Sequence, residues 1–205
     1  PTKPDGFRGE LRSYQADALA WLGFLDTAGL GGCLALDMGL GKTPTMLAHL
    51  HLTRERGPSL VIAPPAVVGN WAAEAKKFVP GSRVRVHHGP NRSSIQDLDR
   101  LCDRADIIIT TYGTAVRDMI GLEKIDWNNV VLDEAQAIKN PSAKVTQALK
   151  TLEVPRRLCL TGTPLENHLG ELWSLFDFLM PGFLGSRKRF NRVYRTPIEV
   201  HGSDE

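Results

Sequence analysis

Cysteine is scarce in this sequence, and long apolar runs are absent from it. Three cysteines stand at positions 33, 102 and 159, an odd number without the spacing of a metal site. We expect buried, reduced thiols in a cytoplasmic protein, and not a disulfide framework. No stretch is apolar for the roughly 20 residues that a membrane-spanning helix needs. Residues 1–10 lack the apolar centre of a signal peptide, so we expect no membrane partner.

A large excess of charge of either sign is also absent. The 25 Lys and Arg residues nearly balance the 23 Asp and Glu residues, which gives a formal net charge of +2. A surface that binds a charged partner must therefore be local, and a solvated surface of mixed charge is the alternative. The length of 205 residues favours one domain with a short extension.

Short apolar runs that end in small or polar residues recur along the chain. Most are apolar throughout and do not alternate, which predicts strands buried on both faces of a parallel sheet. The predicted strands are residues 33–37, 59–63, 84–87, 106–111, 129–133 and 157–161. The predicted helices between them are residues 12–27, 43–54, 71–78, 142–152 and 169–179. This alternation predicts an α/β domain, with a mainly parallel central sheet flanked by helices on both faces.

The pattern changes after Pro181. Residues 182–195 are rich in Gly, Arg and Phe, and the last ten residues are polar, so we expect them to be loosely structured. We therefore assign residues 1–185 to one globular domain and interpret residues 186–205 as the beginning of a linker.

The segment DMGLGKT lies between a predicted strand and a predicted helix. Gly39, Leu40 and Gly41 form a tight turn whose backbone N–H groups can bind phosphate oxygens. The following helix points its positive end at the same anions. Lys42 is expected to reach the β- and γ-phosphates of ATP, and the Thr43 hydroxyl to bind Mg²⁺.

This phosphate loop departs from the standard pattern at Leu36, where a glycine is usual. The shorter helicase-like pattern GxGKT is intact. Pro44, which we include in the ATP-binding set, is tolerated in the first turn of a helix. A glycine-rich turn that binds nothing is the alternative.

Two adjacent carboxylates, Asp133 and Glu134, follow the apolar run VVL. Acidic side chains at the end of a buried strand are costly unless a cation binds there. We expect Asp133 to bind Mg²⁺, partly through water, and Glu134 to orient and deprotonate the attacking water. An acidic first turn of a helix is the alternative.

The segment LTGTP ends another predicted strand in a polar turn. The hydroxyls of Thr161 and Thr163 can hydrogen-bond the acidic pair or a catalytic water, and so respond to the γ-phosphate. A simple turn with threonine caps is the alternative.

In chain order, LRSYQADALAWL, DMGLGKT, APPAVVGNW, IITTYGT, LDEAQAIKN and LTGTPLENHLGELWSLFDFL resemble the motifs of the Swi/Snf-type ATPases. These proteins are the chromatin-remodeller branch of the superfamily-two helicases. The resemblance covers residues 11–199, and the bacterial members, which include an RNA-polymerase-recycling ATPase, are the most similar. It implies a RecA-like P-loop lobe that uses ATP and Mg²⁺, translocates on double-stranded DNA without separating the strands, and remodels bound complexes such as RNA polymerase in the bacterial nucleoid.

The resemblance also implies roles for particular residues. Gln15 corresponds to a glutamine that contacts the adenine edge, with Arg12 nearby; a solvated glutamine is the alternative. The residues that couple ATP to movement correspond to Gln136, where the family usually has histidine, and to Thr161, Gly162 and Thr163. The DNA contacts correspond to Pro65, Asn70, Trp71, Thr110, Thr111 and Tyr112. For Trp71 a place in the core is the alternative.

The family has a second RecA-like lobe, which supplies arginine fingers worth about 10³–10⁵ in rate. Residues 1–205 contain no segment that matches it, so we expect this chain alone to bind nucleotide weakly and to hydrolyse it poorly. A GTPase would need an NKxD segment, which is absent, and a small-molecule kinase would need a lid, which no segment resembles. A DNA- or protein-docking module indifferent to ATP is the remaining alternative.

Overall fold

A single parallel sheet forms the centre of the molecule. The computed structural model describes residues 3–36, 40–162 and 169–200, the last five as backbone only. Six strands lie in the order β1-β6-β5-β2-β4-β3, and all neighbouring strands are parallel. The strands are β1 (Gly32–Ala35), β2 (Ser59–Ala63), β3 (Val84–Val86), β4 (Ile107–Thr111), β5 (Asn129–Leu132) and β6 (Arg157–Thr161). Each begins and ends within two residues of a predicted strand, so the predicted α/β fold is confirmed.

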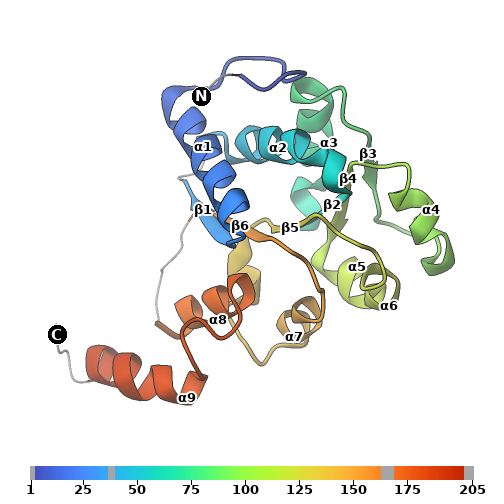
Figure 1. The fold of residues 1–205 in the computed structure, drawn as a ribbon. Coiled ribbons are helices and arrows are strands. Elements are labelled where there is room, and N and C mark those ends of the chain that lie inside the picture. The colour runs from blue at the N-terminus through green and yellow to red at the C-terminus, as the bar shows by residue number, and fades with distance from the viewer. Residues whose placement is uncertain (1–2, 37–39, 163–168, 201–205) are drawn as a thin grey trace.

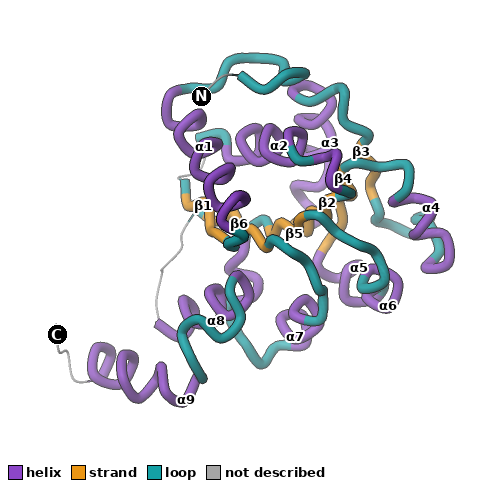
Figure 2. Tube along the Cα trace, in the orientation of Figure 1, coloured by secondary structure: helices purple, strands orange, loops and turns teal. Residues whose placement is uncertain are grey.

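Helices cover both faces of this sheet (Figures 1 and 2). One face packs against α1 (Ser13–Ala28), α2 (Lys42–Leu52) and α3 (Pro65–Phe78). The other packs against α4 (Leu98–Cys102), α5 (Tyr112–Arg117), α6 (Met119–Leu122), α7 (Lys144–Lys150) and α8 (Leu169–Leu179). Short 3-10 helices lie at η1 (Arg54–Arg56), η2 (Ile95–Asp97) and η3 (Ala135–Ile138).

Alternation along the central strand explains why the strand sequences are apolar throughout. In β2, Val61 and Ala63 belong to the core under α1, α2 and α3, whereas Leu60 and Ile62 belong to the core on the other face. Successive side chains of a strand point to opposite faces. Because both faces are covered, every position of β2 is buried, as the sequence predicted.

Helix boundaries differ more from the prediction than strand boundaries do. Helix α3 begins at Pro65, six residues before the predicted start at residue 71. Proline suits the first helical position, because the N–H that it lacks has no partner in the helix there. The four to six residues of α4, α5 and α6 are too few to show a helical period in the sequence.

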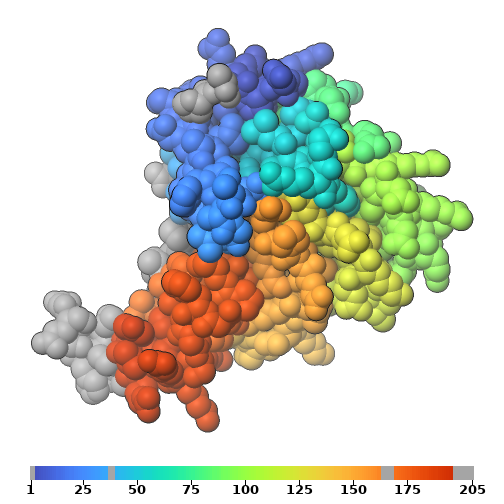
Figure 3. Space-filling view, in the orientation of Figure 1, coloured from blue at the N-terminus to red at the C-terminus, as the bar shows by residue number. Residues whose placement is uncertain are grey.

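The C-terminal segment corrects the expectation of loose chain for residues 196–200, while residues 201–205 lie outside the described residues. Residues 187–200 are helical, as α9 (Arg187–Phe190) and a wide helix η4 (Asn191–Val200). The buried Phe190 ring lies 5.4 Å from that of Tyr194, centroid to centroid, and η4 contacts α8. This segment therefore packs against the sheet domain, although it stands out at one end of the molecule (Figure 3).

Within the described ranges, no helix is sufficiently long and apolar to span a membrane.

Candidate functional site

The carboxyl ends of five strands meet at one edge of the sheet. Strand β1 leads into the phosphate loop, β6 ends at Thr161, and β5 is followed by Asp133. Strand β2 leads to Pro65 at the start of α3, and β4 leads to Tyr112 at the start of α5. Because the strands are parallel, motifs that are far apart in the sequence lie together here. This is the edge at which open α/β sheets bind ligands.

The phosphate loop is tied to α1 through Gln15. The carboxamide nitrogen of Gln15 donates to the carbonyl oxygen of Gly41 at 3.2 Å, and its oxygen accepts from the backbone N–H of Arg12 at 2.9 Å. Gln15 is buried, which excludes the interpretation as a solvated residue. Its contact with adenine remains a prediction.

Gly41 occupies a position that only glycine fits. Its φ is +73°, in the left-handed region, and an added Cβ would collide with the Gln15 carboxamide nitrogen. The residue before α2 can therefore turn the chain sharply only because it lacks a side chain. Gly39 of the predicted set lies outside the described residues.

The first turn of α2 presents the remaining predicted phosphate ligands. The Lys42 ammonium donates to the carbonyl of Leu36, across the loop that the sequence predicts to surround phosphate. Leu40, Thr43 and Pro44 are half-buried at the same end of α2. Their partial exposure leaves them accessible to a ligand at this edge.

Asp133 is a buried carboxylate with two fixed hydrogen bonds. Asp133 is 8% exposed. Oδ2 accepts from the indole N–H of Trp71 at 2.8 Å, and Oδ1 accepts from the backbone N–H of Glu134 at 2.9 Å. Burial raises the pKa of Asp133 above its ordinary value, while the Trp71 hydrogen bond and the charge of Lys42 act in the opposite direction.

The chemistry of this donor set fits Mg²⁺. A buried carboxylate is costly without a nearby cation, and magnesium is usually bound by one or two carboxylates together with phosphate oxygens and water. Among the described residues, no group of three or more His, Cys, Asp or Glu side chains could bind a metal alone. Burial raises the pKa of Asp133, and the charge of Lys42 on α2 opposes that rise. This single carboxylate therefore suits a metal that arrives with a nucleotide.

Glu134 has a strained backbone. Its φ is 51°, and among the described residues it is the one non-glycine residue whose φ is positive. This conformation costs about 1–2 kcal/mol for a residue with a side chain, and such strain occurs preferentially at functional sites. The hydroxyl of Tyr112 donates to the carbonyl oxygen of Asp133 at 2.6 Å and stabilises this turn.

A chain of side chains connects β6 to Glu134. The hydroxyl of Thr161 donates to the carboxamide oxygen of Gln136 at 3.2 Å. The carboxamide nitrogen of Gln136 donates to the carboxylate of Glu134. Gly162 follows Thr161 at the same edge, and Thr163 lies outside the described residues. Thr161 is thus connected to Glu134 through Gln136, and its predicted contact with a catalytic water stays a prediction.

Three of the side chains assigned to DNA contact do not reach the surface. Trp71 and Thr110 are 0% exposed, and Thr111 is 2% exposed. The hydroxyl of Thr110 donates to the carbonyl of His87 at 2.7 Å, and that of Thr111 accepts from the backbone N–H of Thr114 and caps α5. The prediction of direct DNA contact is therefore corrected for these side chains, and the alternative that placed Trp71 in the core holds.

The other residues of that set remain accessible. Pro65 and Asn70 are exposed on α3, and Tyr112 is half-buried. A mainly apolar hollow of about 660 Å³ lies between the starts of α3 and α5 and is also lined by Glu134 and Gln136. DNA contact by Pro65, Asn70 and Tyr112 stays a prediction.

The sequence could not indicate the contact between Trp71 and Asp133. The two residues are 62 positions apart, and only the strand order, with β2 beside β5, brings α3 over the end of β5. Tyr112 reaches the backbone carbonyl of Asp133 for the same kind of reason. Strand β4 lies beside β2, and this brings the start of α5 near the end of β5. No local pattern could have revealed either role.

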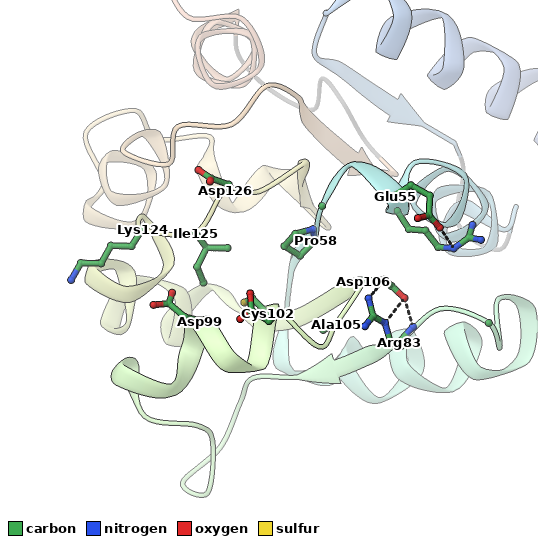
Figure 4. A pocket seen from close by; sticks show the side chains of 14 residues that line it. Glu55, Pro58, Arg83, Asp99, Cys102, Ala105, Asp106, Lys124, Ile125 and Asp126 are labelled. Carbon is green, nitrogen blue, oxygen red and sulfur yellow. Dashed lines mark hydrogen bonds and ion pairs between the residues drawn. The ribbon is translucent and has the colours of Figure 1, made fainter.

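A separate cavity of about 650 Å³ lies at the amino edge of the sheet (Figure 4). It contains no residue of the predicted site, and several of its charges are paired. The guanidinium of Arg83 lies 2.8 Å from Asp106, and that of Arg54 lies 3.6 Å from Glu55. Lys42, Asp133 and Thr161 lie at the opposite, carboxyl edge.

Comparison with known sequences shows the family. A family model described as the SNF2-related domain matches residues 14–205. The putative ATP-dependent helicase/translocase YwqA of Bacillus subtilis is 45% identical over 197 residues, which cover 94% of this chain and 21% of that protein. The TATA-binding protein-associated factor mot1 of Schizosaccharomyces pombe is 38% identical, over 97% of this chain and 11% of that protein. This chain thus spans about a fifth or less of the length of these relatives.

Solved structures agree with the sequence comparison. The Sulfolobus solfataricus SWI2/SNF2 ATPase core in complex with dsDNA is 41% identical and superposes with a TM-score of 0.88, covering 97% of this chain and 42% of that one. The same core domain in a second structure gives a TM-score of 0.86. The two similarities cover 97% and 99% of this chain.

Proposed function

This chain belongs to the SNF2-related family of ATPases, and on that premise we propose that it is the ATP-binding N-terminal lobe of a DNA-dependent ATPase that translocates on double-stranded DNA. The observation that supports this most strongly is the hydrogen-bonded chain from Thr161 through Gln136 to Glu134, beside the buried Asp133 and the phosphate loop. A docking module indifferent to ATP would have no need of this arrangement.

The proposed roles follow from the geometry of the carboxyl edge. Lys42 and the backbone N–H groups of the phosphate loop bind the phosphates of ATP. Thr43 and Asp133 bind Mg²⁺, which when present neutralises charge that develops on the transferred phosphate. Glu134, oriented by Gln136, positions the attacking water and accepts its proton.

Completion of the site requires groups from a second RecA-like lobe of the full-length protein. The Sulfolobus core is more than twice as long as the part of it that this chain covers, which supports such an arrangement. We propose that arginine side chains of that lobe approach the γ-phosphate across the carboxyl edge. ATP binding closes the cleft between the lobes, and hydrolysis reopens it.

Duplex DNA is the proposed track of this motor. The similar Sulfolobus ATPase core is in complex with dsDNA, and α3 of this chain exposes Pro65 and Asn70 beside the nucleotide edge. Contacts of this kind with the phosphate backbone position a duplex without recognising its sequence. The remodelled target is proposed to be a DNA-bound complex such as RNA polymerase, in the bacterial cytoplasm at the nucleoid.

The test is DNA-stimulated phosphate release by the full-length protein with Lys42→Ala. We expect loss of at least about 100-fold, because an interaction with the developing phosphate charge is worth several kcal/mol. Lys124→Ala is the matched control, since Lys124 is an exposed lysine at the amino edge and its loss should leave the rate unchanged. Turnover in the Lys42 variant equal to that of the wild type would contradict the assignment of the phosphate loop. DNA binding that is indifferent to ATP, with no turnover in either protein, would support the docking module instead.

A further inference from the structure

The turn after β5 lies between two helices that pack on opposite faces of the sheet. Helix α3 follows β2 and carries Trp71 in the core on one face. Helix α5 follows β4 and carries Tyr112 against the core on the other face. Both side chains turn toward the same residue, Asp133, and they reach different atoms of it. Asp133 is thus bonded from both faces of the sheet.

The indole of Trp71 fixes the plane of the Asp133 carboxylate. It donates to Oδ2 at 2.8 Å, and the backbone N–H of Glu134 donates to Oδ1 at 2.9 Å. With one donor on each oxygen, the carboxylate cannot rotate without losing a hydrogen bond in a buried setting. Because Trp71 is fully buried, the packed core of α1, α2 and α3 in turn fixes the position of the indole.

Tyr112 fixes the main chain of the same residue. Its hydroxyl donates to the carbonyl oxygen of Asp133 at 2.6 Å, immediately before the strained Glu134 at φ 51°. A hydrogen bond at this point opposes relaxation of the turn. It therefore maintains the direction in which the Glu134 side chain leaves the backbone.

We propose that Trp71 and Tyr112 are positioning residues, which orient the Asp133 carboxylate and the turn to Glu134. They thereby connect α3 and α5, the helices that carry the residues predicted to contact DNA, to the metal and water positions. Movement of α3 or α5 on contact with DNA is transmitted to Asp133 through one hydrogen bond from each helix. The inference rests on the proposed function, because it assigns Asp133 to Mg²⁺ and Glu134 to water.

The first test is the Mg²⁺ requirement of the full-length protein with Trp71→Phe, which removes the N–H and retains an aromatic ring. Partners that orient a metal ligand typically contribute about 10–100-fold in metal affinity or activity. We expect the Mg²⁺ concentration for half-maximal DNA-stimulated hydrolysis to rise about 10-fold or more. Tyr112→Phe should lower kcat, with little change in KM for ATP.

Trp127→Phe is the matched control. Trp127 is also a buried tryptophan, 2% exposed, and its indole donates to a backbone carbonyl, that of Leu122, at 2.8 Å. It belongs to the core on the other face and makes no contact with Asp133. Its replacement should lower stability without changing the Mg²⁺ requirement. An equal Mg²⁺ requirement for the Trp71 and Trp127 variants would overturn the proposal.

The second test needs neither metal nor turnover. The indole N–H resonances of the tryptophans are assigned in the metal-free protein from the two Phe variants, and Asp133→Ala is then introduced. We expect the Trp71 resonance to shift and that of Trp127 to stay in place. An unmoved Trp71 resonance contradicts the hydrogen bond and overturns the inference, even if the Trp71 variant itself folds poorly.

The two proposals fail in different ways. If Lys42→Ala leaves hydrolysis intact, the proposed function is wrong, whatever the indole resonances show. If Lys42→Ala abolishes hydrolysis while Trp71→Phe leaves both the Mg²⁺ requirement and kcat unchanged, the ATPase assignment stands and only the positioning role is lost.

Discussion

Gln136 occupies the place at which related motifs usually carry histidine, and its carboxamide makes two hydrogen bonds at once. Its oxygen accepts from Thr161 and its nitrogen donates to Glu134. A neutral imidazole also has one donor and one acceptor nitrogen. At this position, therefore, the chemistry that the motif needs is the ability to accept on one side and donate on the other.

We expect Gln136→Ala to lower kcat for DNA-stimulated hydrolysis by about 10–100-fold, the usual cost of losing a partner that orients an active-site group. The KM for ATP should change little, because the hydrogen-bond partners of Gln136 among the described residues are Thr161 and Glu134. Gln136→His should retain most of the rate. Steady-state kinetics of the full-length protein measure both, and a histidine variant as slow as the alanine variant would contradict the bridging role.

His49 gives the fold a predicted dependence on pH. Burial lowers the pKa of His49 from 6.5 to about 4; the charge of Asp26 opposes this shift, and Arg156 and Arg56 add to it. The folded pKa lies below the unfolded one, so the unfolded chain binds more protons between these pH values. The contribution of His49 to the free energy of unfolding is therefore fully present above about pH 6.5 and is lost as the pH falls toward 4. The loss amounts to at most on the order of 3 kcal/mol.

Chemical denaturation of His49→Gln and of His88→Gln across pH 4–7 tests this expectation. The His49 variant should show a much shallower loss of unfolding free energy with falling pH. Some slope should remain, because burial also lowers the pKa of His51. The exposed His88 serves as the control, and its variant should behave as the wild type. Identical slopes in all three proteins would contradict the assignment to His49.

At the scale of elements, the turn from β1 to α2 depends on a glycine in the left-handed region, where any other residue is strained. Gly41→Ala should lower the unfolding free energy by about 1–2 kcal/mol, because alanine is strained at a φ of +73°. It should also weaken nucleotide binding, since the added Cβ would displace Gln15 from the loop. Denaturant unfolding and nucleotide titration measure the two effects.

Gly69→Ala is the matched control for this turn. Gly69 lies within α3, and nothing stands within 4 Å of a Cβ added there. Alanine in a helix interior is more stable than glycine by roughly 0.5–1 kcal/mol, so this variant should gain stability. A Gly41 variant that is as stable as the Gly69 variant would show that the loop is not constrained as described.

The sequence predicted the strands more accurately than the helices. Strands buried on both faces have a distinct composition, and residues 59–63 and 157–161 are predicted with the bounds that β2 and β6 have. Helix ends depend on local details such as Pro65 at a first turn, and short helices such as α6 have no period to detect. The prediction of a loose chain from residue 196 onward differs from the helical backbone of residues 196–200, because the packing of η4 on α8 is a tertiary contact. Residues 201–205 of that prediction lie outside the described residues.

At the scale of the whole molecule, the sequence predicted which motifs form the site but not how they contact one another. The order of strands in a parallel sheet brings residues 42, 133 and 161 to one edge, and the motifs alone indicated that common place. The sequence could not show that Trp71, assigned to DNA, is buried against Asp133. Strand order and side-chain packing determine the contacts between elements, and no local sequence pattern predicts either of them.

The central claim is that this lobe contains half of an ATPase site, and phosphate release by residues 1–205 beside the full-length protein tests it most directly. With saturating double-stranded DNA, we expect the chain alone to bind Mg²⁺·ATP through Lys42 and to turn over at least about 10³-fold more slowly than the full-length protein, the usual contribution of an arginine finger. DNA-stimulated turnover by residues 1–205 at the rate of the full-length protein would contradict the account.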